Sequence, residues 1–593
     1  MCGIVGYIGH RRAQPILIRA LKRLEYRGYD SCGIAVVSGE LEVYKDSGRI
    51  SDLEKKLPQI AGKRGIAHTR WATHGEPSQR NAHPHCDCSG KVAVVHNGVI
   101  ENFSELRRVL CDQGHVFRSE TDSEVMSHLV EDYYQGDLAA AVVQALERVR
   151  GCYAFIVLHR DCGDLVVARQ ESPVVIGVGD GEKLIASDVP ALLDYTNEVV
   201  YLEDGDVAVV NQAGLQVSNS GRGVVRSMHR IPWSVEQAEK AGYAHFMLKE
   251  IHEQPQVIDN TMRGRVSVVE GIDLGYKPQA AIKNVVFVAC GSSYYAAMVG
   301  EYLLEKLTPL TTKVKIASEF GHVSCSPENT LVVGVTQSGE TADTIKALHQ
   351  AADAGASTLA VTNVVGSSVT RLAEETIYFH AGPEISVAAT KSFTGQLVIM
   401  YLLGLSLAAL PKSQLGGLLQ ELKRLPVVVA QAIEKEGEIA ELAVRLARYR
   451  DIFYLGRGIN YPIALEGALK LKEIAYVHGE AYPGGELKHG PFALLRPETP
   501  VVAVVAADDT RQQMLTTAKE VGARHAPVIA LISEQDEETE QFVDSVVRLP
   551  AVEPLLSPLV NVVALQLLAY YIARERGCPI DLPANLAKTI TVP

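Results

Sequence analysis

The residue with the clearest chemical potential is Cys2, in the run Met1-Cys2-Gly3-Ile4. If Met1 is removed, Cys2 carries both a thiol and a free α-amine, so one residue supplies a nucleophile and a base. A thiolate is a strong nucleophile, and an α-amine with a pKa of about 8 can accept the thiol proton near neutral pH. Cys2 alone is more simply an ordinary cysteine that starts a strand, so its role depends on what other segments supply.

Three polar clusters in the first third of the chain could assist hydrolysis of the glutamine amide. They are residues 67–75, 96–102 and 120–124. Arg70 can bind a carboxylate through two hydrogen bonds, and Asp122 can pair with an α-ammonium group. Asn97, through its side chain, and Gly98, through its backbone, can donate N–H groups to a developing oxyanion. Each cluster also has a simpler explanation, because Asn-Gly is a common hairpin turn and Thr-Asp-Ser-Glu can start a helix.

A second group of candidates lies on a predicted helix over residues 462–477. Glu466, Lys470 and Glu473 lie at positions i, i+4 and i+7, which puts them on one face of that helix. The rest of the helix is mainly apolar, which favours charges that face a cleft inside the protein. The alternative is a solvated stripe of salt bridges. His489 follows in a loop, and Lys588 lies near the end of the chain, where an exposed and frayed lysine is the simpler interpretation.

Two kinds of architecture must position these residues. Residues 1–210 combine short Val/Ile strands with helices near 14–24, 103–111 and 122–133, which predicts an α+β domain of packed sheets and helices. From about residue 245 the chain alternates buried strands with helices, for example strand 283–289, a helix to 306 and strand 331–337. That alternation predicts a doubly wound parallel sheet.

The α/β pattern occurs twice, with a linker expected near residues 410–440. Residues 286–291 align with 451–456, and residues 331–341 align with 500–510. The first copy has Thr336-Gln337-Ser338-Gly339-Glu340-Thr341 at a strand end, where hydroxyls and free backbone N–H groups can bind a phosphate. The second copy has Asp508 and Asp509 there, and two carboxylates would repel a phosphate. We therefore expect the first copy to hold the anion, although a plain Ser/Thr helix cap remains the alternative.

In combination, the N-terminal motifs resemble the glutamine amidotransferases with an N-terminal nucleophile. The matching segments are Cys2 to Ile8, Arg27 to Ser31, Arg70 to Gly75, Asn81 to His85 and His96 to Gly98. The resemblance implies removal of Met1, Cys2 as nucleophile, and Asn97 and Gly98 as the oxyanion hole. It implies a glutamine pocket, with one of its members gating an internal ammonia channel. The pocket residues are Arg70, Trp71, Thr73, His74 and Asp122, and the gate is Trp71.

The C-terminal two thirds resemble the sugar isomerase domains. Fused behind such an amidotransferase domain, they resemble the enzymes that use glutamine nitrogen to convert fructose 6-phosphate into glucosamine 6-phosphate, the first step of hexosamine synthesis. The resemblance implies that His489 opens the sugar ring, Lys588 forms a Schiff base and Glu473 moves a proton, with Lys470 and Glu466 positioning it. The implied phosphate and sugar contacts are Ser293, Thr336, Gln337, Ser338, Thr341 and Val387. A tail over residues 584–593 would close the site.

The expected organisation is an amidotransferase domain over 1–215, a hinge over 216–245, isomerase domains over 246–415 and 416–580, and a tail over 581–593. The chain has 593 residues, is 47% hydrophobic and carries a net charge of −13 without a long basic block, which argues against nucleic acid. Ten thinly spread cysteines indicate reduced thiols in the cytoplasm. Apolar segments 397–410 and 559–573 are too short to span a bilayer and are expected to be buried helices.

The sequence also bears on cofactors, partners and alternatives. The resemblance implies no metal or organic cofactor, and a homodimer through the isomerase domains. His83, His85, Cys86 and Cys88 have zinc-ligand side chains, but their spacing is too tight for an ordinary tetrahedral site.

Two departures from the family, Ala389 and Ala584, put one substrate hydrogen bond and the tail closure in doubt. The alternatives are another amidotransferase, whose phosphoribosyltransferase or ATP-splitting loop is not found, and a non-catalytic sugar-phosphate sensor.

Overall fold

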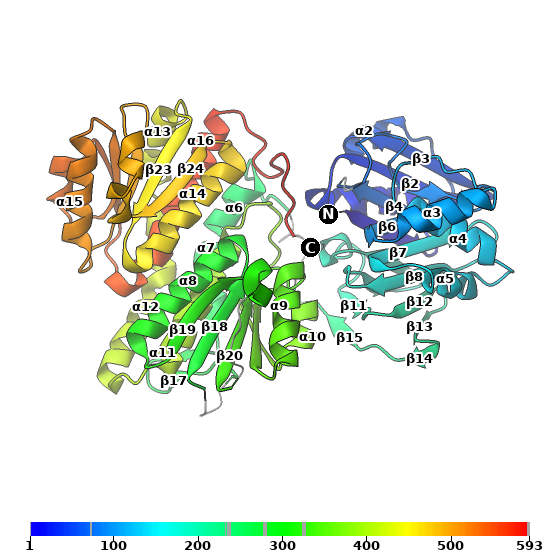
Figure 1. Ribbon diagram of the computed structural model, residues 1–593, viewed down its shortest axis with the longest axis horizontal. Helices are drawn as coiled ribbons and strands as arrows, with labels where there is room; N and C mark the ends of the chain where they lie inside the picture. The colour runs from blue at the N-terminus through cyan, green and yellow to red at the C-terminus, as the bar shows by residue number, and fades with distance from the viewer. Residues whose placement is uncertain are drawn as a thin grey trace. The chain divides into compact units, whose positions relative to one another are not determined.

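The computed structural model describes residues 2–71, 74–231, 233, 239–276, 282–322 and 328–589. The chain divides into two compact units, residues 1–238 with 587–593, and residues 239–586. Figure 1 labels the helices and strands of both units. Each unit has its own layers.

The first unit is built on two antiparallel sheets. One sheet has the order β15-β11-β9-β10-β1-β4-β2-β3, and the other has the order β14-β13-β12-β8-β7-β6-β5. The strands are β1 (Gly3–Ile8), β2 (Ser31–Ser38), β3 (Glu40–Ser47), β4 (Arg64–Arg70), β5 (His85–Cys86), β6 (Val92–Ile100), β7 (Gly151–His159), β8 (Leu165–Gln170), β9 (Val175–Gly179), β10 (Glu182–Ala186), β11 (Glu198–Tyr201), β12 (Asp206–Val210), β13 (Leu215–Asn219), β14 (Arg222–Val224) and β15 (Met228–Arg230). The helices are α1 (Ala13–Lys22), α2 (Ile50–Lys56), α3 (Phe103–Asp112), α4 (Glu124–Tyr133) and α5 (Leu138–Leu146).

Alternation along the strands explains the layers of this unit. Ala93 and Val95 of β6 pack with Ile4 of β1 in the core between the two sheets. Val92 and Val94, the alternate residues of β6, pack instead with α3, α4 and α5 on the outer face. Successive side chains of a strand point to opposite faces, so one strand serves both cores. The predicted α+β domain of packed sheets is confirmed.

The first unit continues beyond the predicted boundary at residue 215. Strand β13 begins at that point and pairs with β12, while β15 pairs with β11. Residues 215–230 therefore belong to the two sheets, because their backbone groups complete the ladders at the sheet edges. The expected hinge over 216–245 is reduced to the residues after β15.

The second unit contains two parallel sheets with the same strand order. They are β19-β18-β20-β21-β22 and β24-β23-β25-β26-β27, and the small pair β16-β17 lies apart from them. The strands are β16 (Val266–Ser267), β17 (Gly271–Ile272), β18 (Asn284–Ala289), β19 (Thr311–Ile316), β20 (Thr330–Val335), β21 (Ser357–Thr362), β22 (Glu375–Tyr378), β23 (Asp451–Gly456), β24 (His478–Pro483), β25 (Val501–Val505), β26 (Val528–Ser533) and β27 (Ser545–Leu549). This equivalence confirms the predicted repeat and the doubly wound sheets.

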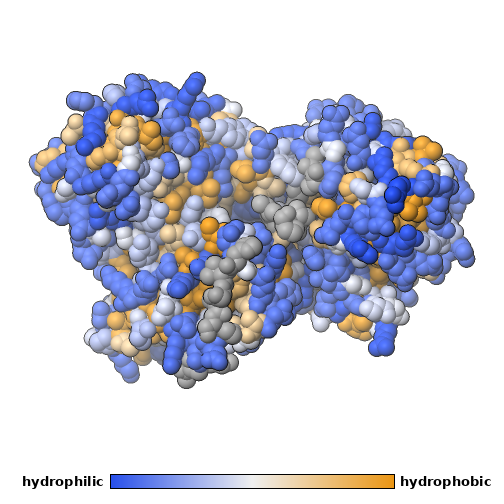
Figure 2. Space-filling model, viewed as in Figure 1, coloured by the Kyte–Doolittle hydropathy of each residue, from blue (hydrophilic) through white to orange (hydrophobic). Residues whose placement is uncertain are grey.

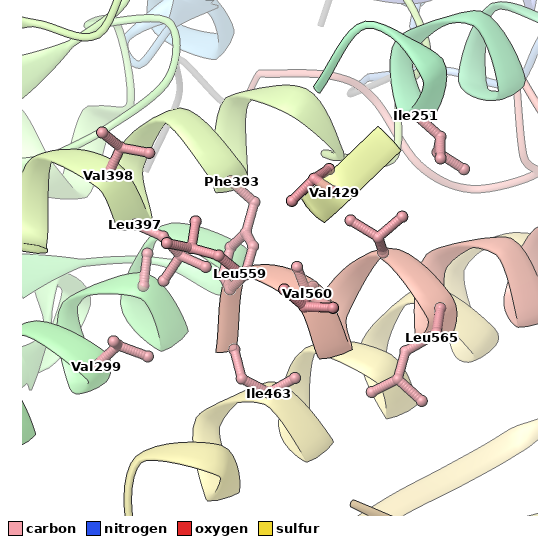
Figure 3. Packing of buried hydrophobic residues seen from close by; sticks show 14 of the residues in the cluster. Ile251, Val299, Phe393, Leu397, Val398, Val429, Ile463, Leu559, Val560 and Leu565 are labelled. Atoms are coloured by element: carbon pink, nitrogen blue, oxygen red, sulfur yellow. The ribbon is translucent and has the colours of Figure 1, made fainter. Parts of the chain in front are cut away.

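Helices join the two copies through one continuous core. They are α6 (Phe246–His252), α7 (Gln254–Met262), α8 (Gly291–Leu307), α9 (Ala342–Asp353), α10 (Ser368–Leu372), α11 (Lys391–Leu407), α12 (Lys412–Ile433), α13 (Glu436–Leu446), α14 (Tyr461–Ala475), α15 (Arg511–Gly522) and α16 (Ser557–Glu575). Figure 3 shows Phe393 and Leu397 of α11 beside Leu559 of α16, with Ile463 of α14 on the other side of α16. The core therefore extends from the first copy into the second without interruption.

The segment expected to link the two copies, near residues 410–440, lies between them in the chain and is helical. That segment forms α12 and the start of α13. Leu422, Leu425 and Val429 of α12 recur at helical spacing and are buried in the shared core. Burying an apolar stripe of this kind lowers the free energy relative to leaving it in water. The connection between the copies is therefore part of the core.

The two long apolar segments are buried helices, as predicted. They correspond to α11 and α16. Among the described residues, residues 554–575 are the only helical stretch long and apolar enough to cross a membrane, and 94% of its most apolar window is buried inside the protein. Figure 2 shows mainly hydrophilic residues on the face of each unit that it presents.

Candidate active sites

Cys2 precedes β1 and lies against the end of β4. Gly3 pairs with Thr69, which brings the Cys2 sulfur to 3.3 Å from the backbone nitrogen of Trp71. Burial raises the pKa of the Cys2 thiol above its ordinary value. The thiol therefore needs a nearby base to become a nucleophile at neutral pH, and the adjacent α-amine is the group that the sequence offers.

The predicted oxyanion donors lie on β6 of the other sheet. Asn97 Nδ2 donates to the Cys2 carbonyl at 2.9 Å. Gly98 has a φ of +132°, and a Cβ there would lie 2.0 Å from the carbonyl oxygen of Cys152. Only glycine fits at such a position, because any side chain would collide with the backbone of β7. The structure thus brings Cys2, Trp71 and Asn97 together.

Arg27 belongs to a matched motif, but its contact with Cys2 was not predicted from the sequence. Its Nε donates to the Cys2 carbonyl at 3.3 Å, and its guanidinium pairs with Asp188 at 3.1 Å. Arg27 is buried, so this ion pair fixes it beside Cys2, the residue before β1. The contact could not be read from the sequence, because Asp188 lies 161 positions away.

The predicted glutamine anchors have defined partners within the protein. Arg70 donates to the carbonyl oxygens of Glu76 at 3.3 Å and Gly75 at 3.0 Å, and also to that of His74. Arg70 therefore shapes the loop that follows it. Asp122 accepts from the backbone nitrogen of Ile100 at 2.8 Å, which ties it to the end of β6.

The remaining members of the predicted pocket differ in how they are placed. Trp71 packs edge-on against Tyr29, with ring centroids 5.7 Å apart. His74 packs edge-on against Phe103, at 5.2 Å. Thr73 lies outside the described residues. Glutamine binding by these residues and by Arg70 and Asp122 remains a prediction.

In the second unit, α14 carries a buried charged triad. Lys470 Nζ lies 2.5 Å from Glu473 Oε2 and 3.4 Å from Glu466 Oε1. The side chains of Lys470 and Glu466 are fully buried, while Glu473 is 22% exposed. The alternative of a solvated stripe is therefore wrong, and Glu473 is the member of the triad that solvent or a ligand can reach.

Burial and mutual charge set the ionisation of this triad. Burial raises the pKa of Glu466 to about 7, against the opposing effect of Lys470. Burial also lowers the pKa of Lys470, but the carboxylates of Glu466 and Glu473 outweigh it and raise that pKa above its ordinary value. Lys470 therefore stays cationic, and Glu466 titrates near neutral pH.

Ser292 links the triad to the first isomerase copy and was not predicted. Its Oγ lies 3.1 Å from both Glu466 Oε1 and Lys470 Nζ. Ser292 is in the first turn of α8, which starts at the carboxyl end of β18. The neighbouring Ser293, a predicted sugar-phosphate residue, accepts from Gln396 Nε2 at 2.9 Å. The sequence showed both serines, but their partners are distant along the chain, 174 positions for Glu466 and 103 for Gln396.

The predicted phosphate loop lies between β20 and α9. Thr336 Oγ1 lies 2.8 Å from Thr341 Oγ1, and the backbone nitrogen of Glu340 donates to Ser338 Oγ at 3.1 Å. Strands β18 and β20 are neighbours whose helices α8 and α9 begin at the same sheet edge. The order β19-β18-β20 reverses direction there, and ligands of open α/β sheets bind at such a point. Ser293, Thr336, Gln337, Ser338 and Thr341 therefore share this edge.

The equivalent loop of the second copy has a different design. Asp508 Oδ1 accepts from the backbone nitrogen of Thr510 at 2.8 Å and from its hydroxyl at 2.6 Å. A carboxylate thus takes the N–H group that a phosphate would use. This arrangement agrees with the expectation that only the first copy binds an anion.

The last three predicted residues lie in different parts of the chain. His489 is exposed and ends a short turn, with its backbone nitrogen bonded to Glu486. Val387 is nearly buried, and its backbone nitrogen donates to the carbonyl of Asp581 at 3.1 Å. Lys588 belongs to the first compact unit, whereas Glu473 belongs to the second. The catalytic roles of His489 and Lys588 and the substrate contact of Val387 remain predictions.

Comparisons with known proteins cover the whole chain. A family model described as a SIS domain matches residues 280–406 and 445–575, and one described as a glutamine amidotransferase domain matches residues 68–194. The glutamine–fructose-6-phosphate aminotransferase (isomerizing) of Symbiobacterium thermophilum is 48% identical over 608 residues, covering 100% of both chains. An enzyme of the same name from Thermus thermophilus is 47% identical over 603 residues, also covering 100% of both.

One solved structure agrees with the second unit. The C-terminal domain of glucosamine-fructose-6-phosphate aminotransferase from Francisella tularensis is 37% identical, with a TM-score of 0.55. It covers 58% of this chain and 99% of its own. Both family models, the full-length relatives and the two site geometries agree. The chain therefore belongs to the glutamine–fructose-6-phosphate aminotransferase (isomerizing) family.

Proposed function

We propose that this enzyme transfers the amide nitrogen of L-glutamine to D-fructose 6-phosphate, giving D-glucosamine 6-phosphate and L-glutamate as the first step of hexosamine synthesis. The observation that carries the proposal is the presence of two complementary sites in one chain. One unit holds Cys2, whose carbonyl accepts from Asn97, and the other holds the triad of α14 linked by Ser292 to the sheet edge of the predicted phosphate loop.

In the first unit, the Cys2 sulfur attacks the amide carbon of glutamine. The α-amine takes the thiol proton and passes it to the departing ammonia. Asn97 and Gly98 stabilise the negative oxygen of the tetrahedral intermediate, and Arg70 and Asp122 hold the two ends of the amino acid. Water then attacks the thioester, which releases glutamate and restores the thiol.

In the second unit, the loop over residues 336–341 and Ser293 hold the phosphate. His489 opens the sugar ring, and Lys588 forms a Schiff base with the C2 ketone. Ammonia displaces Lys588 and leaves an imine at C2. Glu473 removes a proton from C1 and returns one to C2, which makes an aldehyde at C1 and an amine at C2.

Lys470 acts by positioning Glu473. Their ion pair of 2.5 Å holds the Glu473 carboxylate in place, and Ser292 and Glu466 also contact Lys470. A homodimer through the isomerase domains and a cytoplasmic location complete the proposal, and both are expectations from the sequence.

The two half-reactions can be separated by substitution. Glu473→Gln should reduce glucosamine 6-phosphate formation by about a hundredfold or more, because it removes the base, while glutamate release continues. Lys472→Gln, an exposed neighbour on α14, should leave both rates unchanged. Amino-sugar formation at the parental rate in the Glu473→Gln protein would contradict the assignment.

A further inference from the structure

A cluster of metal-ligating side chains lies in the first unit, apart from the residues assigned to glutamine. Cys88, His115, His128 and Glu131 each offer a ligand atom, and all these atoms lie within 4.8 Å of one another. Cys88 is in the turn between β5 and β6, and His115 follows α3. His128 and Glu131 are one turn apart on α4. Three separate segments thus converge on one point.

Four of the distances within the cluster match those of a tetrahedron around zinc. Cys88 Sγ lies 3.6 Å from Nδ1 of both His115 and His128. Glu131 Oε2 lies 3.2 Å from His115 Nδ1 and 3.4 Å from His128 Nδ1. Zinc bonds are about 2.3 Å to sulfur and about 2.0–2.2 Å to nitrogen and oxygen. At tetrahedral angles these bonds place sulfur about 3.6 Å from nitrogen, and nitrogen about 3.3–3.4 Å from oxygen.

Hydrogen bonds alone account poorly for this arrangement. Each Nδ1 faces both the Cys88 sulfur and Glu131 Oε2, but a ring nitrogen has at most one hydrogen to give. The sulfur already accepts from the backbone nitrogen of Val116 at 3.4 Å. Lone pairs therefore converge on a point where a cation would satisfy all of them.

Hydrogen bonds from neighbouring groups orient His115 and Glu131, as such bonds orient the ligands of known metal sites. His115 Nε2 lies 2.8 Å from Asp132 Oδ1, which places its hydrogen on Nε2 and leaves the Nδ1 lone pair directed at the cluster. Backbone nitrogens of Cys88, at 3.0 Å, and Ser89, at 3.2 Å, hold the Glu131 carboxylate. His128 is buried, and its Nε2, 3.7 Å from Glu124 Oε1, has no hydrogen-bond partner among the described residues.

We propose that Cys88, His115, His128 and Glu131 bind one zinc ion. Binding exchanges the thiol proton of Cys88, which passes to solvent, for a zinc–sulfur bond. The thiolate and the Glu131 carboxylate balance the charge of the ion. Four protein ligands fill a tetrahedral coordination shell, so the site is structural and has no open position for catalysis.

The ion would join α4 to the turn before β6 and to the loop after α3. Asp122, the predicted ammonium anchor for glutamine, lies just before α4. Two other zinc-ligand side chains of the run from His83 to Cys88 have partners elsewhere. His83 stacks on His68 with ring centroids 4.1 Å apart, and His85 Nε2 lies 3.0 Å from Thr121 Oγ1. Only Cys88 of that run belongs to the proposed site.

The test measures zinc in the full-length protein carrying Cys2→Ala, which removes metal binding by the nucleophile. After chelation and gel filtration, the protein is titrated with zinc against a chromogenic chelator and its bound metal is counted by mass spectrometry. One zinc per chain is expected. Cys88→Ser should lower the bound zinc at least tenfold, while Cys111→Ser, another exposed cysteine, should retain it.

Cobalt provides a readout of the ligands themselves. Co²⁺ in the Cys88-containing protein should give the visible absorption of a tetrahedral site and a near-ultraviolet thiolate-to-cobalt band, and Cys88→Ser should abolish that band. His128→Gln should also lose the metal, and circular dichroism identifies a variant that has merely unfolded. Zinc binding that is absent at micromolar free metal, or equal in the parent and Cys88→Ser, would overturn the proposal. Neither outcome depends on the aminotransferase reaction.

Discussion

At the scale of single residues, Glu466 shows how burial sets the chemistry of α14. Its carboxylate is fully buried and next to a buried lysine. An isolated buried carboxylate would be protonated, whereas Lys470 favours the charged form, and the pKa settles at about 7 instead of the ordinary 4.5. Glu466 therefore changes charge within the pH range where the enzyme is expected to work, two turns away from Glu473.

This shift predicts a pH-dependent stability. Between pH 4.5 and 7 the folded state binds a proton at Glu466 that the unfolded state has lost, so this residue's contribution to stability falls as the pH rises through that window. Glu466→Gln removes the contribution. The melting temperature of the parent minus that of Glu466→Gln should fall from pH 4.5 to pH 7 and then level off. Glu441→Gln, an exposed change on α13, should give a constant difference, and a constant difference for Glu466→Gln would refute the interpretation.

The placement of residues was predictable from the sequence where a short motif contained them. Spacing on one helix was enough to place Glu466, Lys470 and Glu473 on a common face. Ser292 and Arg27 were missed because their partners lie 174, 178 and 161 positions away. The cluster around Cys88 was missed for the same reason, since its two histidines come from other segments. A single sequence carries no record of such tertiary pairs.

At the scale of elements, the loop between β20 and α9 depends on Gly339. Its φ is +69°, and a Cβ there would lie 1.9 Å from Ser367 Oγ. Ser367 is buried and donates to the carbonyl of Val364 at 2.9 Å, so it cannot move aside easily. The glycine allows the tight turn between Ser338 and Thr341.

We predict that Gly339→Ala weakens fructose 6-phosphate binding at least tenfold, about 1.4 kcal/mol. Gly355→Ala is a matched control, because Gly355 follows α9 with a φ of +86° and a Cβ added there would meet no atom within 4 Å. Both substitutions place an alanine at a positive φ, which destabilises the fold. Only Gly339→Ala also brings its Cβ against another atom, so only that change forces the loop to shift. Isothermal titration calorimetry measures the binding, and equal affinities for the two variants would show that the loop does not hold the phosphate.

Most elements were predictable because hydrophobic periodicity marks them directly. The strands and helices of the first isomerase copy lie within a few residues of their expected positions. The features that the sequence did not show lie in the connection between the two copies and at the edges of the first unit's sheets. Residues 410–440 do link the two copies, but the sequence did not show that this segment is helical and packs its leucines into the shared core. Strands β13 to β15 were not expected, because short edge strands have little pattern of their own and are held by pairing with β12 and β11.

At the scale of the whole molecule, the chain combines two unlike units with complementary chemistry. The first frees ammonia from glutamine, and the second incorporates ammonia into a sugar phosphate. The internal repeat was visible in the sequence, and the matching strand orders of the two parallel sheets confirm it. The proposed difference in phosphate binding has a local chemical basis, because in the second copy Asp508 accepts from the backbone nitrogen of Thr510.

The central claim is that the nitrogen of the amino sugar comes from the side chain of glutamine. The most direct measurement supplies glutamine labelled with ¹⁵N at the amide, fructose 6-phosphate and the Met1-processed enzyme, and follows both products by mass spectrometry. We predict ¹⁵N-labelled glucosamine 6-phosphate in equal amount to glutamate, with both abolished by Cys2→Ala. Glutamate formed without labelled amino sugar would contradict this claim and would require another nitrogen acceptor.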